Sequence, residues 1–214
     1  MIPNKIIGIA KNYPTKQLPY PIFFTKPWSS ILSSSTSQVI KLKKEFSLST
    51  NYEFELGVII GKTTKSIKEK DYKDYIGGYI LALDLTEKTR NPMMTKTSDS
   101  QLISKGLDGY TPIGKFIEKE KIPDPNEVYM ELYVNNQLVQ NGKTGDLVYK
   151  ISQQMVMLSE YMVLNKGDIL LSGTYNNINI IRPKDRIHGV SYINSNNNNE
   201  KRLISEIRFE VQEE

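Results

Sequence analysis

The 214-residue sequence contains no cysteine, one histidine and one tryptophan. Without cysteine the chain can form neither disulfides nor thiolate metal sites, and catalysis by a cysteine nucleophile is excluded. No apolar run approaches the roughly 18 residues that a membrane helix requires, so no membrane partner is expected. The first residues resemble neither a signal peptide nor an Arg/Ser-rich transit peptide, which predicts a cytoplasmic location and leaves a mitochondrial one open.

The sequence also lacks a strong excess of positive or negative charge. The formal net charge is +4, from 28 Lys and Arg and 24 Asp and Glu, and the lysines are mixed with acidic and apolar residues. No basic helix and no interleaving of aromatic and basic residues is present, so nucleic acid is not expected as a partner. The length suits a single domain over residues 1–214. The Asn-rich stretch 194–199 is expected to be a surface insertion in a hairpin.

Alternation and short apolar runs indicate many strands and few helices. A helix is expected at 66–75, where Ser66 and Glu69 have the form of a capping box, and a clearer one at 149–163. Asn135 and Asn136 tolerate positive φ and predict a hairpin turn. Residues 28–37 and 87–104 are expected to be loops, the second with a helical turn. Strands are expected at 6–10, 21–27, 39–42, 52–60, 79–85, 128–134, 137–140, 168–172 and 206–211.

Three carboxylates lie in or beside the two most apolar strands. Glu53 and Glu55 share one face of the strand at 52–60, because successive strand side chains point to opposite faces. Asp84 follows the apolar run 79–83. Hard oxygen ligands favour Mg²⁺, Mn²⁺ or Ca²⁺ over zinc. From spacing alone, two interpretations stay open: a divalent-metal site, or acidic side chains that face solvent or pair with lysines.

The residues around these carboxylates resemble the fumarylacetoacetate hydrolase family, most closely its short, acylpyruvase-type members. The resemblance runs from about residue 6 to 211 and is most specific in the acidic block 52–61 and in Ser172-Gly173-Thr174. Further matching blocks occur in the same order along the chain: Lys11-Asn12-Tyr13, Phe24-Thr25-Lys26-Pro27, Asp74-Tyr75-Ile76-Gly77-Gly78-Tyr79, Leu83-Asp84-Leu85-Thr86 and Gly167-Asp168-Ile169-Leu170.

This resemblance implies a β-rich α/β fold, a mixed β-sandwich roll, and assembly as a homodimer. It implies Mg²⁺ or Mn²⁺ held by Glu53, Glu55 and Asp84, with Lys105 as the active-site lysine. Gln140 and Thr174 lie where family members contact the substrate, and Lys26 is expected to support the same pocket. The alternative for both lysines is a solvated or structural role. The implied substrates are 2-oxo acids with a second carbonyl, such as acylpyruvates, which are β-diketo acids, and oxaloacetate.

The sequence departs from the family pattern where its hydrolases carry a His–Glu pair that activates water. Lys16 and Pro19 stand at those positions, and the only histidine, His188, lies far along the chain. Three interpretations follow. The leading one, which rests on the family label, is a metal-dependent hydrolase that cleaves a carbon–carbon bond in acylpyruvate-like substrates through a stabilised enolate. The second is an oxaloacetate decarboxylase or tautomerase that needs only the metal and Lys105. The third is a metal-binding relative with little activity.

Overall fold

The computed structural model describes residues 5–13, 20–47, 49–88, 101–175, 177–194 and 200–214. Its larger sheet is eight-stranded, in the order β2-β1-β13-β6-β7-β9-β3, with β10 paired to β7. Chain neighbours such as β6 and β7 pair antiparallel, whereas β13 brings a late segment between β1 and β6. The strands are β1 (Ile6–Ala10), β2 (Ile22–Lys26), β3 (Ile31–Ser33), β6 (Phe54–Ile60), β7 (Ile76–Leu83), β9 (Thr111–Ile113), β10 (Ile117–Glu118) and β13 (Ile169–Leu171).

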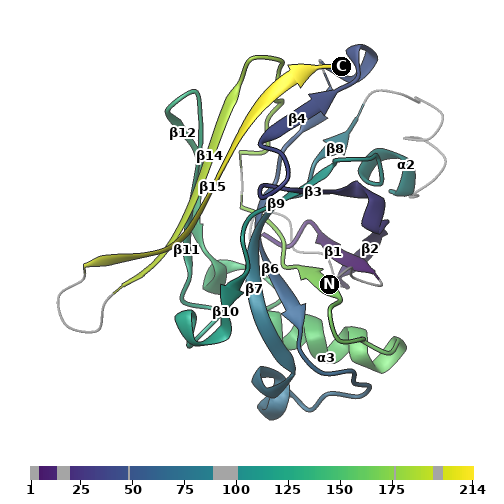
Figure 1. Cartoon of the computed structure of the whole chain (residues 1–214). Helices are drawn as coiled ribbons and strands as arrows, with labels where there is room; N and C mark the ends of the chain where they lie inside the picture. Colours follow the sequence, from purple (N-terminus) through teal and green to yellow (C-terminus); the bar gives the residue numbers. More distant parts are fainter. Residues whose placement is uncertain (1–4, 14–19, 48, 89–100, 176, 195–199) are drawn as a thin grey trace.

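A five-stranded sheet stands against the first, to its left in Figure 1, and a two-stranded ladder joins β5 to β8. Asn135 and Asn136 have φ of 52° and 66°, which confirms the predicted hairpin turn between β11 and β12. β14 and β15 flank the Asn-rich stretch, of which residues 195–199 lie outside the described residues. These strands are β4 (Val39–Leu42), β5 (Thr50–Asn51), β8 (Thr86–Glu87), β11 (Tyr129–Val134), β12 (Gln137–Lys143), β14 (Arg186–Asn194) and β15 (Lys201–Glu213).

The predicted helix at 149–163 is α3. The helical turn predicted within 87–104 corresponds to α2, and residues 89–100 of that loop lie outside the described part. The capping box at Ser66 is wrong. Ser66 has a φ of 59°, and a 3₁₀ helix, η4, starts only at Glu69. Ser159 of α3 holds this segment instead, because its carbonyl and hydroxyl accept the N–H groups of residues 66 and 67. The helices are α2 (Leu102–Lys105), α3 (Ile151–Tyr161), η2 (Trp28–Ser30), η3 (Lys44–Phe46), η4 (Glu69–Tyr75), η5 (Lys119–Lys121) and η6 (Thr144–Asp146).

The main core lies between the two sheets and under α3, and it receives every second side chain of β6. Phe54 belongs to this set, and its ring packs on Gly189 of β14, where a Cβ would approach the ring to 2.7 Å. Side chains as large as Phe54 fix the strand that carries them, because a close-packed interior leaves little room for movement. The backbone between Glu53 and Glu55 is therefore anchored from the core side.

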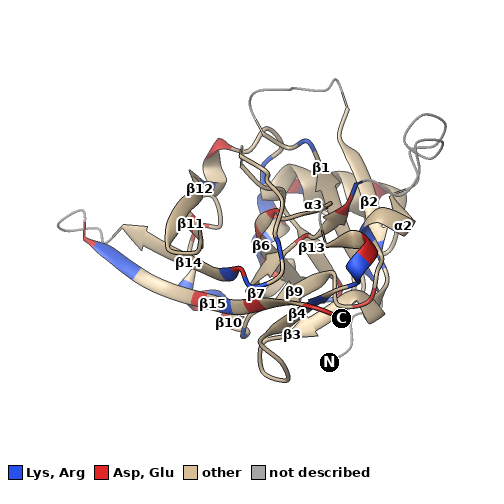
Figure 2. Cartoon of the chain, turned by 90° about the horizontal axis from the view of Figure 1, so that it is seen from above, with Lys and Arg blue, Asp and Glu red and all other residues tan. Residues whose placement is uncertain are grey.

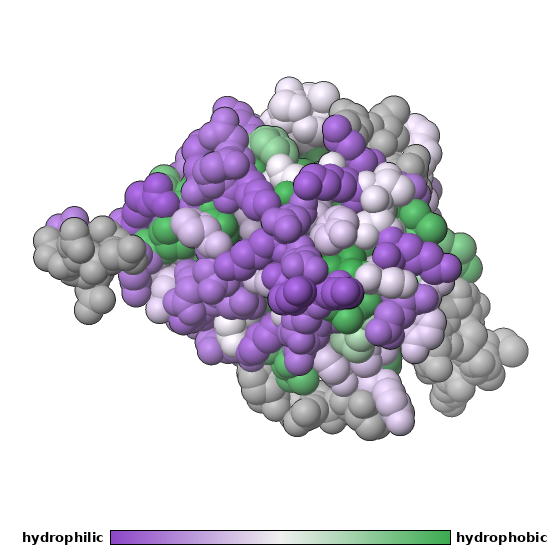
Figure 3. Space-filling model, turned by 90° about the horizontal axis from the view of Figure 1, so that it is seen from below, coloured by the Kyte–Doolittle hydropathy of each residue, from purple (hydrophilic) through white to green (hydrophobic). Residues whose placement is uncertain are grey.

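Charged residues of both signs are spread along the whole chain rather than gathered in one stretch (Figure 2), as the sequence predicts. The face seen from below is mostly hydrophilic, with hydrophobic residues in small separate areas (Figure 3).

An apolar groove of about 670 Å³ lies on the face of the larger sheet that points away from the main core, and it is bordered by Trp28, Ile80 and Phe116. The predicted loop at 28–37 is wrong in part, because η2 and β3 form one side of this groove. No helix among the described residues has the length and apolar character that crossing a bilayer requires.

Candidate metal centre

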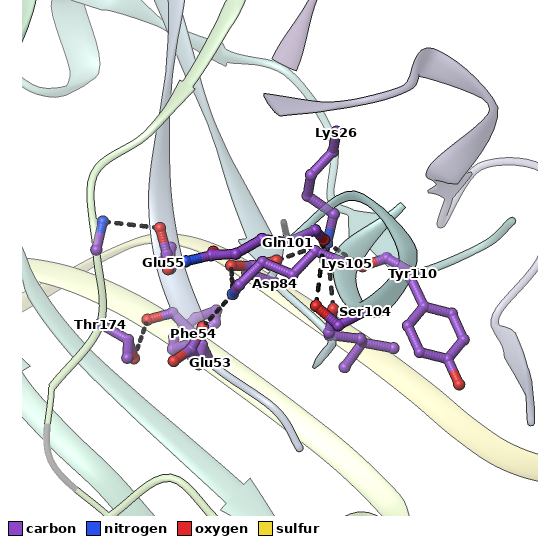
Figure 4. Close-up of polar contacts among 12 residues, drawn as sticks. Lys26, Glu53, Phe54, Glu55, Asp84, Gln101, Ser104, Lys105, Tyr110 and Thr174 are labelled. Atoms are coloured by element: carbon purple, nitrogen blue, oxygen red, sulfur yellow. Dashed lines mark hydrogen bonds and ion pairs between the residues drawn. The ribbon is translucent and has the colours of Figure 1, made fainter. Parts of the chain in front are cut away.

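The register of β6 and β7 brings the three carboxylates together. Phe54 pairs with Leu83, so that the start of β6 lies beside the end of β7. Glu53 precedes β6 and Asp84 follows β7, and the Asp84 N–H donates to the Glu53 carbonyl at 2.8 Å. One carboxylate oxygen from each of Glu53, Glu55 and Asp84 lies within 4.8 Å of the others. The three side chains converge, as Figure 4 shows, rather than pointing to separate surfaces.

Lys105, the last residue of α2, extends its ammonium into this cluster. Its Nζ lies 2.8 Å from Glu53 Oε2 and also donates to the Asp84 carboxylate. The ring of Phe24 lies on another side, with its centre 4.5 Å from Nζ. The positive charge of Lys105 is therefore stabilised by two carboxylates at once.

Lys26, the last residue of β2, approaches Asp84 from the opposite side of the carboxylate. Its Nζ lies 2.5 Å from Asp84 Oδ1 and donates to the carbonyls of Tyr110 at 2.7 Å and Leu85 at 3.3 Å. An ammonium has three N–H groups, so each of them has an acceptor here. Its side chain is fully buried. Lys26 thus fixes Asp84, while a contact of Lys26 with substrate stays a prediction.

The pKa values around Asp84 follow from burial and these ion pairs. Burial alone would raise the pKa of Asp84, but the charges of Lys105 and Lys26 outweigh it and hold the pKa below its usual range. Burial would lower the pKa of Lys105, yet Asp84 and Glu53 raise it above the ordinary value. Burial lowers the pKa of Lys26, and Asp84 opposes this only in part. Lys105 is therefore an ammonium at neutral pH.

Glu55 is the least compensated of the carboxylates. Its Oε2 accepts the N–H of Gly173 at 2.7 Å, and no lysine or arginine in the described part of the chain lies within ion-pair distance of it. Burial, followed by the charges of Asp84 and Glu53, raises its pKa well above the usual value. Burial also raises the pKa of Glu53, although Lys105 acts against this.

Gln140 and Thr174 approach the cluster through the backbone of Phe54. Thr174 Oγ1 donates to the Phe54 carbonyl at 3.0 Å, and Gln140 Oε1 accepts the Phe54 N–H at 3.2 Å. Gln140 Nε2 in turn donates to Thr174 Oγ1 at 3.3 Å and to the carbonyl of Tyr175 at 3.2 Å. Both side chains are buried. They hold the peptide groups that join Glu53 to Glu55, and their contact with substrate stays a prediction.

His188 is remote from the carboxylates, on β14 of the five-stranded sheet. Its Nε2 lies 2.9 Å from Glu206 Oε2, and the interaction is partly exposed to solvent. Lys16 and Pro19 belong to the segment 14–19, which lies outside the described residues. No histidine therefore takes part in the carboxylate cluster, and this agrees with the missing His–Glu pair in the sequence.

The sequence did not single out Gly173 as the hydrogen-bond donor to Glu55. Gly173 lies in a matching block, as does Asn12, which packs on it, whereas Gln154 of α3 lies in none of the matching blocks. The one signal for Gln154 is its position beside Met155 on the apolar side of α3, where a buried amide needs hydrogen-bond partners.

The donor set fits a hard divalent cation. Two buried carboxylates, Glu55 and Asp84, and the partly buried Glu53 face two ammonium groups, so the cluster retains an excess of negative charge, and its oxygens lie at the adjoining ends of two paired strands. Mg²⁺ and Mn²⁺ prefer such oxygen ligands. A β-rich α/β fold with converging carboxylates and a buried lysine defines a candidate metal-dependent enzyme.

The chain belongs to the fumarylacetoacetate hydrolase family, because the family model described as Fumarylacetoacetate (FAA) hydrolase C-terminal matches residues 5–197. An oxaloacetate decarboxylase, mitochondrial, of Dictyostelium discoideum is 34% identical over 187 residues, which cover 84% of this chain and 85% of the relative. Oxaloacetate tautomerase FAHD1, mitochondrial, of Homo sapiens is 30% identical over 191 residues, which cover 86% and 85%.

Solved structures share the fold. The maleylpyruvate hydrolase from Sphingobium sp. SYK-6, in complex with manganese (II) ion and pyruvate, is 29% identical with a TM-score of 0.80, covering 99% of this chain and 71% of that one. These findings confirm the predicted family and its β-rich α/β fold. They also confirm the expected enzyme class at the level of the family, whose relatives named here are decarboxylases, tautomerases and hydrolases.

Proposed function

We propose that this protein forms and protonates the enolate of an oxaloacetate-like 2-oxo acid, with Glu53, Glu55 and Asp84 holding Mg²⁺ or Mn²⁺ and Lys105 as the catalytic acid. The observation that carries the proposal is the Lys105 ammonium inside the three-carboxylate cluster. Similarity to an oxaloacetate decarboxylase and an oxaloacetate tautomerase supports the substrate class. A divalent cation held by these three carboxylates would supply a Lewis acid that stabilises the negative charge of an enolate.

Lys105 supplies the proton. Its raised pKa keeps Nζ protonated at neutral pH, as a proton donor must be, and opposes the neutral amine that a Schiff base requires. A cation held by the same carboxylates would lower this pKa, toward the range in which an acid gives up its proton readily. Glu53 and Asp84 orient the ammonium, and Lys26 holds Asp84 in turn. Burial of the cluster limits access of water and strengthens these interactions.

Decarboxylation and tautomerisation share this machinery. In decarboxylation the bond between C3 and the C4 carboxylate breaks, CO₂ leaves, and the electron pair remains on the enolate of pyruvate. One proton from Lys105 Nζ to C3 then completes pyruvate, and solvent returns the proton to the lysine. In tautomerisation no carbon–carbon bond breaks. The enol of oxaloacetate loses its hydroxyl proton to solvent, Lys105 Nζ delivers a proton to C3 to give the keto form, and solvent returns a proton to the lysine.

One preparation with Mn²⁺, assayed on several substrates, tests the proposal. Loss of enol absorbance measures tautomerisation, pyruvate formation measures decarboxylation, and cleavage of an acylpyruvate measures hydrolysis. We expect turnover of oxaloacetate to exceed hydrolysis and to disappear with a chelator. Faster acylpyruvate hydrolysis would contradict the proposal, and so would oxaloacetate turnover that a chelator leaves unchanged.

Hydrolysis of an acylpyruvate-like substrate is the second candidate, and the similarity to a maleylpyruvate hydrolase with manganese and pyruvate favours it. It requires a base that deprotonates water. His188 is too remote to serve, and the described residues around the cluster offer carboxylates already engaged with lysines or with Gly173. Binding of Mn²⁺ without turnover of either substrate class would favour the third interpretation, a metal-binding relative with little activity.

We also propose that residues 1–214 act as one catalytic unit that assembles as a homodimer. Light scattering should then give about twice the chain mass of 24.5 kDa. The predicted location is the cytoplasm, with the mitochondrion as the alternative that the two relatives named as mitochondrial favour.

A further inference from the structure

Two buried amide side chains hold the peptide group between Ser172 and Gly173. Asn12 Nδ2 lies 2.9 Å from the Ser172 carbonyl oxygen, and Gln154 Nε2 lies 3.0 Å from the same oxygen. Asn12 follows β1 and Gln154 lies on α3, so the two amides reach this oxygen from distant parts of the chain. Both are buried, with exposed fractions of 1% and 0%.

The same two amides also donate to the carbonyl of Tyr149. The distances are 3.0 Å from Asn12 Nδ2 and 2.8 Å from Gln154 Nε2. Asn12 Oδ1 accepts the Tyr149 N–H at 2.7 Å, which fixes the orientation of the Asn12 amide. Two carbonyl oxygens and two amide donors therefore form a closed set in which neither donor moves without loss of hydrogen bonds.

The opposite side of this peptide group faces the carboxylate cluster. In a trans peptide the C=O and the N–H point in opposite directions. The Ser172 carbonyl points to the two amides, and the Gly173 N–H points to Glu55 Oε2 at 2.7 Å. Hydrogen bonds in a chain polarise one another, so two donors on the carbonyl oxygen strengthen the N–H as a donor to the carboxylate.

Only glycine suits residue 173 in this arrangement. Its φ of 99° lies in the left-handed region, and a Cβ there would come within 2.8 Å of the Asn12 Cβ. Asn12 thus supports the peptide group both by packing on Gly173 and by hydrogen bonding to Ser172.

We propose that Asn12 and Gln154 are positioning residues that orient Glu55 as a metal ligand through the Ser172–Gly173 peptide group. The inference rests on the proposed role of Glu55. Hydrogen bonds to ligating carboxylates set their direction, and loss of such a partner typically weakens metal affinity 10- to 100-fold. Asn12 and Gln154 touch neither substrate nor metal and act only through this peptide group.

The substitution Gln154→Met tests the inference. Methionine matches the length of the side chain and removes the donor, while Asn12 continues to satisfy both carbonyl oxygens. Gln154 Oε1 has no hydrogen-bond partner among the described residues, so the change leaves no former partner of that oxygen unpaired. We expect Mn²⁺ to bind about 10-fold more weakly in a calorimetric titration. In the metal-free protein we expect the Gly173 amide to exchange with deuterium roughly 10-fold faster by NMR.

Gln153→Met is the matched control, because Gln153 is exposed on the same helix and its side chain accepts the Lys150 N–H at the start of α3, away from the Ser172–Gly173 peptide group. If Gln154→Met does not fold, Asn12→Ala removes the other donor. Unchanged Mn²⁺ affinity and unchanged Gly173 exchange would overturn the inference, even if thermal stability fell, and so would equal effects of Gln153→Met. Absence of Mn²⁺ binding in the wild type would refute the proposed function, and Gly173 exchange would then decide on the positioning alone.

Discussion

Among the three carboxylates, Glu55 is the one whose negative charge has no lysine or arginine partner in the described part of the chain. Replacing it by glutamine keeps an oxygen for the Gly173 N–H and removes one of three converging charges. We therefore expect Glu55→Gln to lose measurable Mn²⁺ binding and all metal-dependent turnover. The metal-free variant should be at least as resistant to urea as the wild type, because repulsion with Asp84 and Glu53 is relieved.

Glu118→Gln is a suitable control for this experiment, because Glu118 is exposed and forms only a long ion pair of 3.9 Å. Mn²⁺ affinity retained in Glu55→Gln would remove this residue from the ligand set. A large loss of stability in the metal-free variant would show that its charge is compensated.

A substitution at Lys105 is expected to affect catalysis and metal binding in opposite directions. In Lys105→Met the proton donor is lost, and we expect turnover of oxaloacetate to fall roughly 10²- to 10⁴-fold. Mn²⁺ should bind at least as tightly as in the wild type, because a positive charge next to the carboxylates is gone. Steady-state kinetics at saturating Mn²⁺ and a calorimetric titration measure the two effects, with the exposed Lys62→Met as control. Nearly normal turnover would exclude Lys105 as the acid.

Among the elements, β1 and β13 are joined just before their first residues, where Asp168 binds Lys5. The Asp168 side chain is buried and accepts the Lys5 ammonium at 2.5 Å, the Lys5 N–H at 3.2 Å and the Asn165 N–H at 2.7 Å. Asp168→Ala should lower the free energy of unfolding by roughly 2–4 kcal/mol, because a partly buried ammonium and two backbone N–H groups lose their acceptor. Urea denaturation measures this, and Glu118→Ala should cost no more than about 1 kcal/mol. A loss below 1 kcal/mol in Asp168→Ala would contradict the expected role.

The five-stranded sheet contains a carboxyl group, that of Glu131, whose contribution to the stability of the fold depends on pH. Glu131 of β11 accepts the hydroxyls of Tyr133 at 2.7 Å and Tyr192 at 2.8 Å and the ammonium of Lys201 at 2.9 Å. Burial would raise the pKa of Glu131, but these hydrogen bonds outweigh it and lower the pKa below its ordinary value of 4.5.

A carboxyl group with a lowered folded pKa contributes stability above its unfolded pKa and loses it as the pH falls through the folded pKa. Glu131→Gln should therefore destabilise the protein by a constant amount from about pH 6 to 8 and by less and less below about pH 4.5. Urea denaturation of both proteins across this range measures the difference. A difference that grows on acidification would show that the pKa is raised instead.

At the scale of the whole molecule, a metal that binds only the folded chain must stabilise it. At a free Mn²⁺ concentration of 100 times its dissociation constant the gain is about 2.7 kcal/mol. For a chain of this length the melting temperature should rise by roughly 5–10 °C. Scanning calorimetry with Mn²⁺ and then with excess chelator measures the shift, and Glu55→Gln should show none. An equal shift in Glu55→Gln would place the metal elsewhere.

Local pattern was enough to predict much of the fold. The strands at 6–10 and 39–42 and the Asn135–Asn136 turn agree with the structure, because alternation and positive-φ residues act over a few positions. The capping box at Ser66 failed because tertiary hydrogen bonds to Ser159 outweigh a local preference. The strands β3 and β9 were missed because each is short and pairs with a distant segment.

The sequence by itself determined the chemistry available: three carboxylates and a lysine, an all-oxygen donor set without cysteine, and no histidine near the family's dyad positions. Side-chain identity and strand periodicity are local properties, so they can be seen in the linear chain. Only the tertiary structure decided that Lys105 bridges Glu53 and Asp84, and that Glu55 meets a peptide N–H instead of a cation. Those contacts depend on strand register and join residues far apart in the chain, 52 positions for Lys105 and Glu53 and 118 for Gly173 and Glu55. They form because burial and Coulomb interactions act through space rather than along the chain.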